Sequence, residues 1–184
     1  MRSSFISGLV CLSLAKYSVG LPQLPLLQSA RPFQPIQARA ILLSPTGAPI
    51  FGVIDFRATT LTEVQVDVVV NGLEAFVPQA NHAYHIHASP VGPDGDCAAA
   101  GAHLSAAGIP DSVPCNPMMP RLCQEGDLSG KHGVLPGNQR VVQSSYTDST
   151  LQFLSPESGI IGRGLVVHDA KGARIACGNI TRVN

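Results

Sequence analysis

The chain has 184 residues, of which 13% are charged, and its 12 basic and 12 acidic side chains give no net charge. No basic run is present, so nucleic acid is not expected as a partner. The length corresponds to one domain with a short extension. The 18 glycines and 15 prolines recur throughout and divide the chain into short segments, which favours an all-β fold over a helical bundle.

The first twenty residues have the features of a secretory signal peptide. Arg2 supplies a positive start, residues 5–15 are apolar, and residues 18–20 offer small side chains for cleavage. Lys16 ends the apolar stretch well short of the roughly 20 residues needed to span a bilayer, so no membrane span is expected. We predict residues 1–20 as a signal peptide, and a secreted protein that is extracellular or associated with a cell wall.

After the signal, the chain changes from an irregular segment to strand-like patterns. Residues 21–37 hold four prolines without alternation and predict a linker or extended arm. Residues 38–184 predict an antiparallel, eight-stranded Greek-key β-barrel or sandwich without a convincing helix. The strands are expected near residues 38–44, 49–56, 62–73, 81–89, 140–143, 150–154, 159–168 and 173–179. The clearest of them alternates valine with other residues from Val64 to Val70, which is typical of one buried face.

A long stretch without periodicity, residues 90–137, separates two groups of expected strands. Loops of this length in a compact domain are usually functional or cross-linked, and this one holds three of the four cysteines that remain once Cys11 leaves with the signal. An even number of cysteines fits an oxidising compartment. Four cysteines allow three pairings, and their spacing alone does not choose among them.

The histidines suggest a metal site. His85 and His87 are spaced i, i+2, so on a strand both face the same side, about 7 Å apart. Such a pair alone is more often two ordinary polar side chains than a site. His82 has the opposite parity and is expected on the surface, and His132 is expected in a solvated turn.

Five motifs, in order, make the resemblance to a known family specific. They are H-x-H at residues 85–87, G-D-C-x-x-x-G-x-H at 95–103, G-D-L-S-G-K-H-G at 126–133, G-R-x-L-V-V-H at 162–168 and R-x-A-C-G at 174–178. Over residues 38–180 the chain resembles the copper/zinc superoxide dismutases. The resemblance implies conversion of superoxide to dioxygen and hydrogen peroxide.

The resemblance also implies roles for single residues. The implied copper ligands are His85, His87, His103 and His168. Arg174 would lie beside the copper and attract superoxide, and His103 would help to deliver a proton. The implied disulfide joins Cys97 to Cys177.

The chain departs from the zinc-containing members of that family. In those enzymes His103 would also bind zinc, together with two further histidines and an aspartate. Asp127 matches the aspartate, but no histidine lies between His103 and Lys131, so zinc is not expected. The segment between His168 and Arg174 is also short. Both features resemble the copper-only extracellular fungal branch, which a second disulfide, Cys115–Cys123, also fits.

Without zinc, another group must orient His103, because metal-bound histidines usually donate their second N–H to a carboxylate or carbonyl. Asp127 is the first candidate and Glu125 the second. Gln124 stands where the branch tends to carry glutamate, and a glutamine does not take up a proton at ordinary pH.

Three further expectations concern the protein as a whole. Asn179 begins an N-I-T glycosylation sequon. A monomer is the default expectation, although the sequence does not fix the oligomeric state. The alternative to an enzyme is a non-catalytic extracellular copper-binding module on the same fold, since fold does not determine function.

Overall fold

The computed structural model describes residues 34–75 and 80–183. The predicted signal peptide and most of the predicted arm therefore lie outside the described residues. The described residues belong to a single compact unit.

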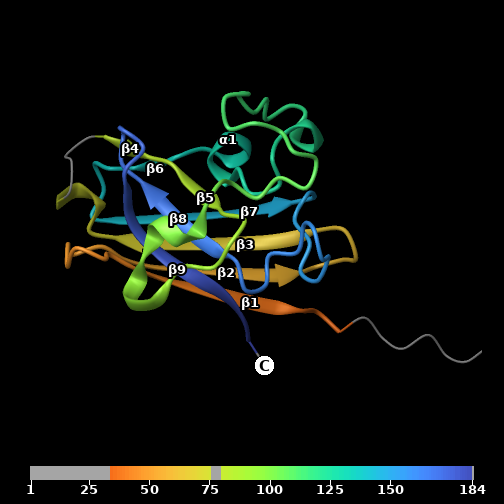
Figure 1. The fold of residues 1–184 in the computed structure, drawn as a ribbon, viewed down its shortest axis with the longest axis horizontal. Helices are drawn as coiled ribbons and strands as arrows, with labels where there is room; N and C mark the ends of the chain where they lie inside the picture. Colours follow the sequence, from red (N-terminus) through yellow and green to blue (C-terminus); the bar gives the residue numbers. More distant parts are fainter. Residues whose placement is uncertain (1–33, 76–79, 184) are drawn as a thin grey trace, which may run out of the picture. The chain divides into compact units, whose positions relative to one another are not determined.

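Within the described residues most of the regular secondary structure is β-strand (Figure 1). Seven strands form one antiparallel sheet in the order β5-β8-β9-β1-β2-β3-β7, and β4 and β6 form a separate pair. The strands are β1 (Gln37–Leu43), β2 (Phe51–Ala58), β3 (Val64–Asn71), β4 (Asn81–His82), β5 (Tyr84–Ile86), β6 (Leu135–Pro136), β7 (Val141–Asp148), β8 (Gly164–His168) and β9 (Arg174–Val183). The helices are α1 (Leu128–His132) and the 3-10 turns η1 (Leu73–Ala75), η2 (Pro93–Gly95), η3 (Cys97–Ala100) and η4 (Pro120–Leu122).

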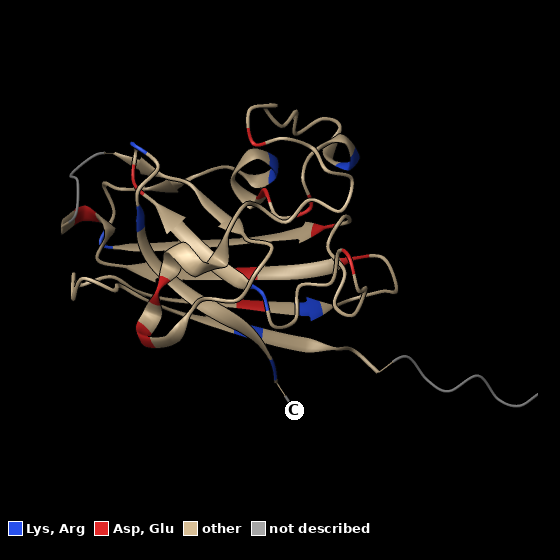
Figure 2. Cartoon of the chain, viewed as in Figure 1, with Lys and Arg blue, Asp and Glu red and all other residues tan. Residues whose placement is uncertain are grey.

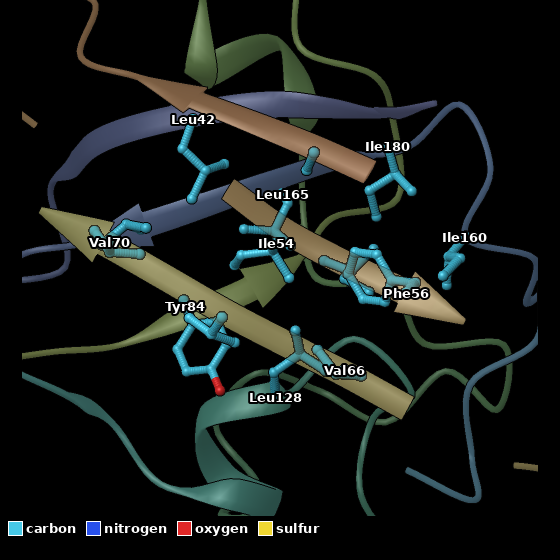
Figure 3. Close-up of a cluster of buried hydrophobic side chains, with 14 of the residues drawn as sticks. Leu42, Ile54, Phe56, Val66, Val70, Tyr84, Leu128, Ile160, Leu165 and Ile180 are labelled. Atoms are coloured by element: carbon cyan, nitrogen blue, oxygen red, sulfur yellow. The ribbon is translucent and has the colours of Figure 1, made fainter. Parts of the chain in front are cut away.

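The core forms on the inner face of the curled sheet. Every second residue of β3, from Val64 to Val70, is buried, which confirms the predicted alternation. Figure 3 shows side chains from β1, β2, β3, β8 and β9 gathered in one cluster, which includes Leu42, Ile54, Phe56, Val66, Leu165 and Ile180. Full burial of a side chain of this kind contributes about 1.5–3 kcal/mol.

The antiparallel β architecture is confirmed, but several predicted strands differ in extent from those in the structure, among them residues 81–89, which form the separate strands β4 and β5. Residues 150–154 form an isolated bridge from Gln152 to Gly159 instead of a strand, and Asp148 Oδ1 accepts hydrogen bonds from the backbone N–H groups of Thr150 and Leu151. The strand predicted for residues 159–168 begins only at Gly164, as β8. The expectation of no helix missed α1, a five-residue helix.

The long segment between β5 and β7 contributes no strand to the main sheet. Cys97–Cys177 joins it to β9 across 80 residues of sequence, and Cys115–Cys123 closes a smaller loop within it. Both pairings are those that the resemblance implied. Part of the segment, with α1, lies at the top of Figure 1.

Among the described residues, lysine and arginine are dispersed over several elements, as Figure 2 shows. Arg39 and Asp55 pair across β1 and β2 at 2.6 Å. No helix among the described residues is long and apolar enough to cross a membrane.

Candidate metal centre

The four predicted histidines meet at one place in the fold. His85 lies in β5, His87 directly follows it, and His168 ends β8, which pairs with β5. One ring nitrogen from each of them and from His103 lies within 4.8 Å of the others. In the parts of the chain that the structure describes, this is the one such group of histidine, cysteine or carboxylate side chains.

His103 reaches the site because its segment runs antiparallel to the chain after β5. His87 and His103 form an isolated β-bridge, and the Leu104 N–H donates to the Ile86 carbonyl at 2.9 Å. Leu104 is buried in the core and anchors this segment. Backbone pairing therefore brings a loop residue to the strand that carries the H-x-H pair.

Hydrogen bonds fix which ring nitrogen three of these histidines expose. The Nδ1 of His87 donates to the Gly101 carbonyl at 2.8 Å, and the Nδ1 of His168 donates to the Gly172 carbonyl at 3.1 Å. The His103 Nδ1 lies 2.8 Å from the Gln124 side-chain oxygen. Because these oxygens only accept, each Nδ1 carries the proton and each Nε2 keeps its lone pair.

The fourth histidine has the opposite arrangement. His85 Nδ1 is buried without a hydrogen-bond partner, whereas its Nε2 lies 3.5 Å from Asp127 Oδ1. The same Oδ1 accepts a hydrogen bond from the Gly130 N–H at 2.7 Å, which caps α1 and holds the carboxylate in place. His85 therefore offers Nδ1 to the site.

This donor set fits a metal ion. The Nε2 atoms of His87 and His168 face each other at 3.2 Å, so two lone pairs repel unless a cation lies between them. A bound cation would also satisfy the orphaned Nδ1 of His85. Imidazole nitrogens suit copper as well as zinc, nickel and iron.

Burial favours the neutral form of the His85, His87 and His168 imidazoles, the form that binds a metal. Burial, with a smaller contribution from the neighbouring histidines, lowers the pKa of His85 to about 2. Burial lowers the pKa of His87 to about 4, with the Arg174 charge also contributing, and burial lowers the pKa of His168 as well.

Arg174, the first residue of β9, lies at the same site. Its guanidinium donates to the carbonyls of Cys97 and Gly101, each at 2.5 Å. It lines a pocket of about 470 Å³ together with the four histidines and the carboxylate of Asp111. The disulfide-anchored η3 thus holds a positive charge beside the histidine cluster.

Two histidines lie elsewhere than the sequence predicted. His82 is fully buried instead of exposed, and its Nδ1 donates to the His168 carbonyl at 3.2 Å. The parity argument failed because β4 and β5 are separate strands, with a break at Ala83. His132 is no solvated turn residue: it ends α1, stacks on Tyr146 and bonds Asp148 at 2.8 Å.

The groups proposed to orient His103 also require correction. Gln124, and neither Asp127 nor Glu125, accepts from His103. Asp127 lies against His85 instead, and the Glu125 carboxylate accepts from the Ala106 N–H at 2.9 Å. No spacing in the sequence distinguishes these three neighbours.

The glycosylation sequon stays a prediction. The Asn179 side chain accepts from the Val91 N–H at 2.7 Å and donates to the Val91 carbonyl at 3.3 Å. Its amide therefore already joins β9 to the loop before η2.

Comparisons with known proteins agree with this site. The sequence model of copper/zinc superoxide dismutase matches residues 50–180. A cell surface Cu-only superoxide dismutase of Arthroderma benhamiae is 35% identical over 105 residues, which are 55% of this chain and 28% of that protein. Cell surface Cu-only superoxide dismutase 5 of Candida albicans is 30% identical over 72% of this chain and 55% of its own length. The chain thus spans about half or less of these two relatives.

Among solved structures, Candida albicans superoxide dismutase 5 with Cu(II) matches with a TM-score of 0.67 and 26% identity. The match covers 81% of this chain and 93% of that chain. The likeness therefore extends over almost all of the solved copper-bound domain.

Proposed function

The chain belongs to the copper/zinc superoxide dismutase family, whose sequence model covers residues 50–180, and on that premise we propose that it is a copper-dependent superoxide dismutase. It converts superoxide to dioxygen and hydrogen peroxide. The observation that carries the proposal is the convergence of four imidazoles, with one ring nitrogen from each within 4.8 Å of the others, beside Arg174.

Three histidines offer Nε2 and His85 offers Nδ1 to the copper ion. Bound there, copper supplies one-electron chemistry between Cu(II) and Cu(I). The carbonyls of Gly101 and Gly172 keep two of the rings in the orientation that presents Nε2. Such contacts to a ligand's second nitrogen typically matter 10–100-fold in metal affinity.

Arg174 attracts the substrate anion. Its hydrogen-bond partners are neutral carbonyls, and among the described residues no carboxylate lies within 4 Å of its nitrogens. The positive charge at the pocket is therefore not neutralised by an ion pair. A charge of this kind raises the local concentration of a small anion and its rate of capture.

The site works with copper and without zinc. A bridging histidine would need a free second nitrogen, but the Nδ1 of His103 already donates to Gln124. Zinc sites usually require four firm ligands, and the described residues supply no second cluster of this kind. The names of the two Cu-only relatives support the same assignment.

The protein acts outside the cell or at the cell wall. Its fungal relatives are named cell surface enzymes, and a Drosophila melanogaster relative, 30% identical over 79% of this chain, is named an extracellular superoxide dismutase. The signal peptide predicted for residues 1–20 supports the same location.

Metal analysis of the secreted protein, purified with copper and zinc both supplied, tests the proposal together with a stopped-flow superoxide assay. We expect about one copper per chain, essentially no zinc, and activity well above that of free copper. His168→Ala should weaken copper binding by more than about a hundredfold, since it removes a ligand rather than a partner of a ligand.

Two outcomes would contradict the proposal. Stoichiometric zinc would exclude the copper-only assignment. Copper held firmly, with no activity beyond free copper, would favour the non-catalytic binding module.

A further inference from the structure

The side-chain amide of Gln124 lies against the His103 ring. A side-chain amide can present either its oxygen or its NH₂ group to such a neighbour. Its Oε1 lies 2.8 Å from His103 Nδ1, while its Nε2 donates to the Ile109 carbonyl at 2.7 Å and to Asp111 Oδ1 at 2.8 Å. Gln124 is 5% exposed, so water does not replace these partners. Every hydrogen-bonding group of this side chain is thus committed to the protein.

The surroundings of the amide nitrogen permit only one of the two orientations. The Ile109 carbonyl and the Asp111 carboxylate are acceptors without a proton to donate. A flipped amide would place its oxygen against both of them and its NH₂ group against His103. The cost would be that of buried, unpaired polar groups, about 1–3 kcal/mol each.

From this geometry we propose that Asp111 is a positioning residue for the copper site. Its carboxylate holds the Gln124 amide so that Oε1 faces His103. His103 must then carry its proton on Nδ1 and keep the Nε2 lone pair for the metal. The inference deepens the proposed function and rests on it, because it concerns a ligand of the proposed copper.

Asp111 also acts on His103 directly. Its Oδ1 lies 3.5 Å from His103 Nδ1, and a negative charge there favours a proton on that nitrogen. The Asp111 side chain is 55% exposed and lines the pocket of the histidines, so no core packing accounts for its place. Asp111 and Gln124 therefore both favour the His103 tautomer with its proton on Nδ1.

The contact between Asp111 and Gln124 predicts that a glutamate at position 124 weakens Cu(II) binding unless residue 111 changes too. In Gln124→Glu, a carboxylate oxygen would lie against Asp111 and the Ile109 carbonyl, three acceptors without a shared proton. In the double variant Gln124→Glu/Asp111→Asn, the new amide of residue 111 donates to the glutamate. A double-mutant cycle measures this coupling.

The experiment uses three measurements on the wild type, Asp111→Ala, Asp111→Asn, Gln124→Glu and the double variant Gln124→Glu/Asp111→Asn. They are Cu(II) affinity by competition titration, the Cu(II) electron paramagnetic resonance spectrum, and the His103 tautomer of the metal-free protein by ¹⁵N NMR. We expect Asp111→Ala to lose about tenfold in Cu(II) affinity, the lower end of the range for a group behind a ligand. We also expect an altered copper spectrum and a mixture of His103 tautomers in the metal-free protein. Gln124→Glu should lose more, and the double variant should recover most of that loss.

Glu125→Gln is the matched control, since it also removes a carboxylate charge from this loop but touches no histidine of the cluster. Thermal unfolding of each variant reports whether it folds. If Asp111→Ala keeps the wild-type affinity, spectrum and single tautomer, the proposal is wrong while the proposed function stands. If the wild type itself binds no copper, the proposed function fails, and the tautomer measurement still decides the role of Asp111.

Discussion

The main sheet and the segment between β5 and β7 are stabilised by different interactions. In β1, β2 and β3, antiparallel pairing in register and alternate apolar side chains supply the stability. The segment between β5 and β7 has little regular structure, and two disulfides and buried polar contacts fix it instead. Because this segment supplies His103, Gln124 and Asp127, the position of His103 depends on these anchors, whereas the paired strands β5 and β8 carry His85 and His168.

The strongest polar anchor is a buried ion pair at α1. The Lys131 ammonium, fully buried, donates to Asp148 at 2.6 Å, to Thr150 Oγ1 at 2.7 Å and to the Glu125 carbonyl at 2.8 Å. Burial alone would raise the pKa of Asp148, but the His132 hydrogen bond and the Lys131 charge hold it well below its usual value. Lys131 therefore joins the end of β7 to the chain between Gln124 and Asp127.

The largest expected effect on stability comes from removing the longer disulfide. Cys97→Ser/Cys177→Ser should lower the free energy of unfolding by about 4–5 kcal/mol, and Cys115→Ser/Cys123→Ser by about 2–3 kcal/mol, because the closed loops differ greatly in length. Urea unfolding of the two double variants measures the difference. Equal losses would show that chain entropy does not govern how these bridges stabilise the segment.

A somewhat smaller loss is expected from Lys131→Met. This change leaves the buried Asp148 carboxylate without its cation, which typically costs about 3–5 kcal/mol. It also releases the Glu125 carbonyl, so Cu(II) affinity should fall together with the free energy of unfolding. Urea unfolding and copper titration on the same samples test both effects.

Two control variants distinguish effects of the sheet core from effects of the segment between β5 and β7. Ile54→Ala opens a cavity in the sheet core and should cost about 2–5 kcal/mol, yet leave Cu(II) affinity unchanged. Lys171→Met removes an exposed lysine and should change the free energy of unfolding little. If Ile54→Ala weakened copper binding as much as Lys131→Met did, the site would depend on the sheet instead of its own anchors.

The same division explains what the sequence could predict. The alternation in β3 and the H-x-H spacing are local patterns, so the sheet and the two neighbouring histidines follow from them directly. The motifs of the resemblance added His103, His168, Arg174 and the disulfides.

What the sequence did not predict depends on contacts between distant residues. The buried His82 ring bonds the backbone carbonyl of His168. The buried Lys131 ammonium pairs with the Asp148 carboxylate, 17 positions further along the chain. In the sequence Lys131 looks like any solvated charge in a glycine-rich turn. The Asp111 and Gln124 contact has no local signature either, since it joins two irregular parts of one loop.

The smallest expected effect concerns the rate with superoxide. Arg174→Ala should lower it about tenfold, the lower end of what electrostatic steering gives, and should flatten its dependence on ionic strength. Stopped-flow rates over a range of salt concentrations measure both effects. Arg174 binds no copper in this proposal, so the copper content should stay near that of the wild type.

Arg174→Lys distinguishes the charge of Arg174 from its role as a tether. The Gly101 carbonyl accepts from both Arg174 and His87, so losing the guanidinium could also disturb a copper ligand. A lysine keeps the charge but cannot form the forked contact with Cys97 and Gly101. If steering dominates, Arg174→Lys keeps the salt dependence and most of the rate. If the lysine variant were as slow as the alanine variant and showed an altered copper spectrum, the principal role of Arg174 would be to hold η3 and Gly101 against His87.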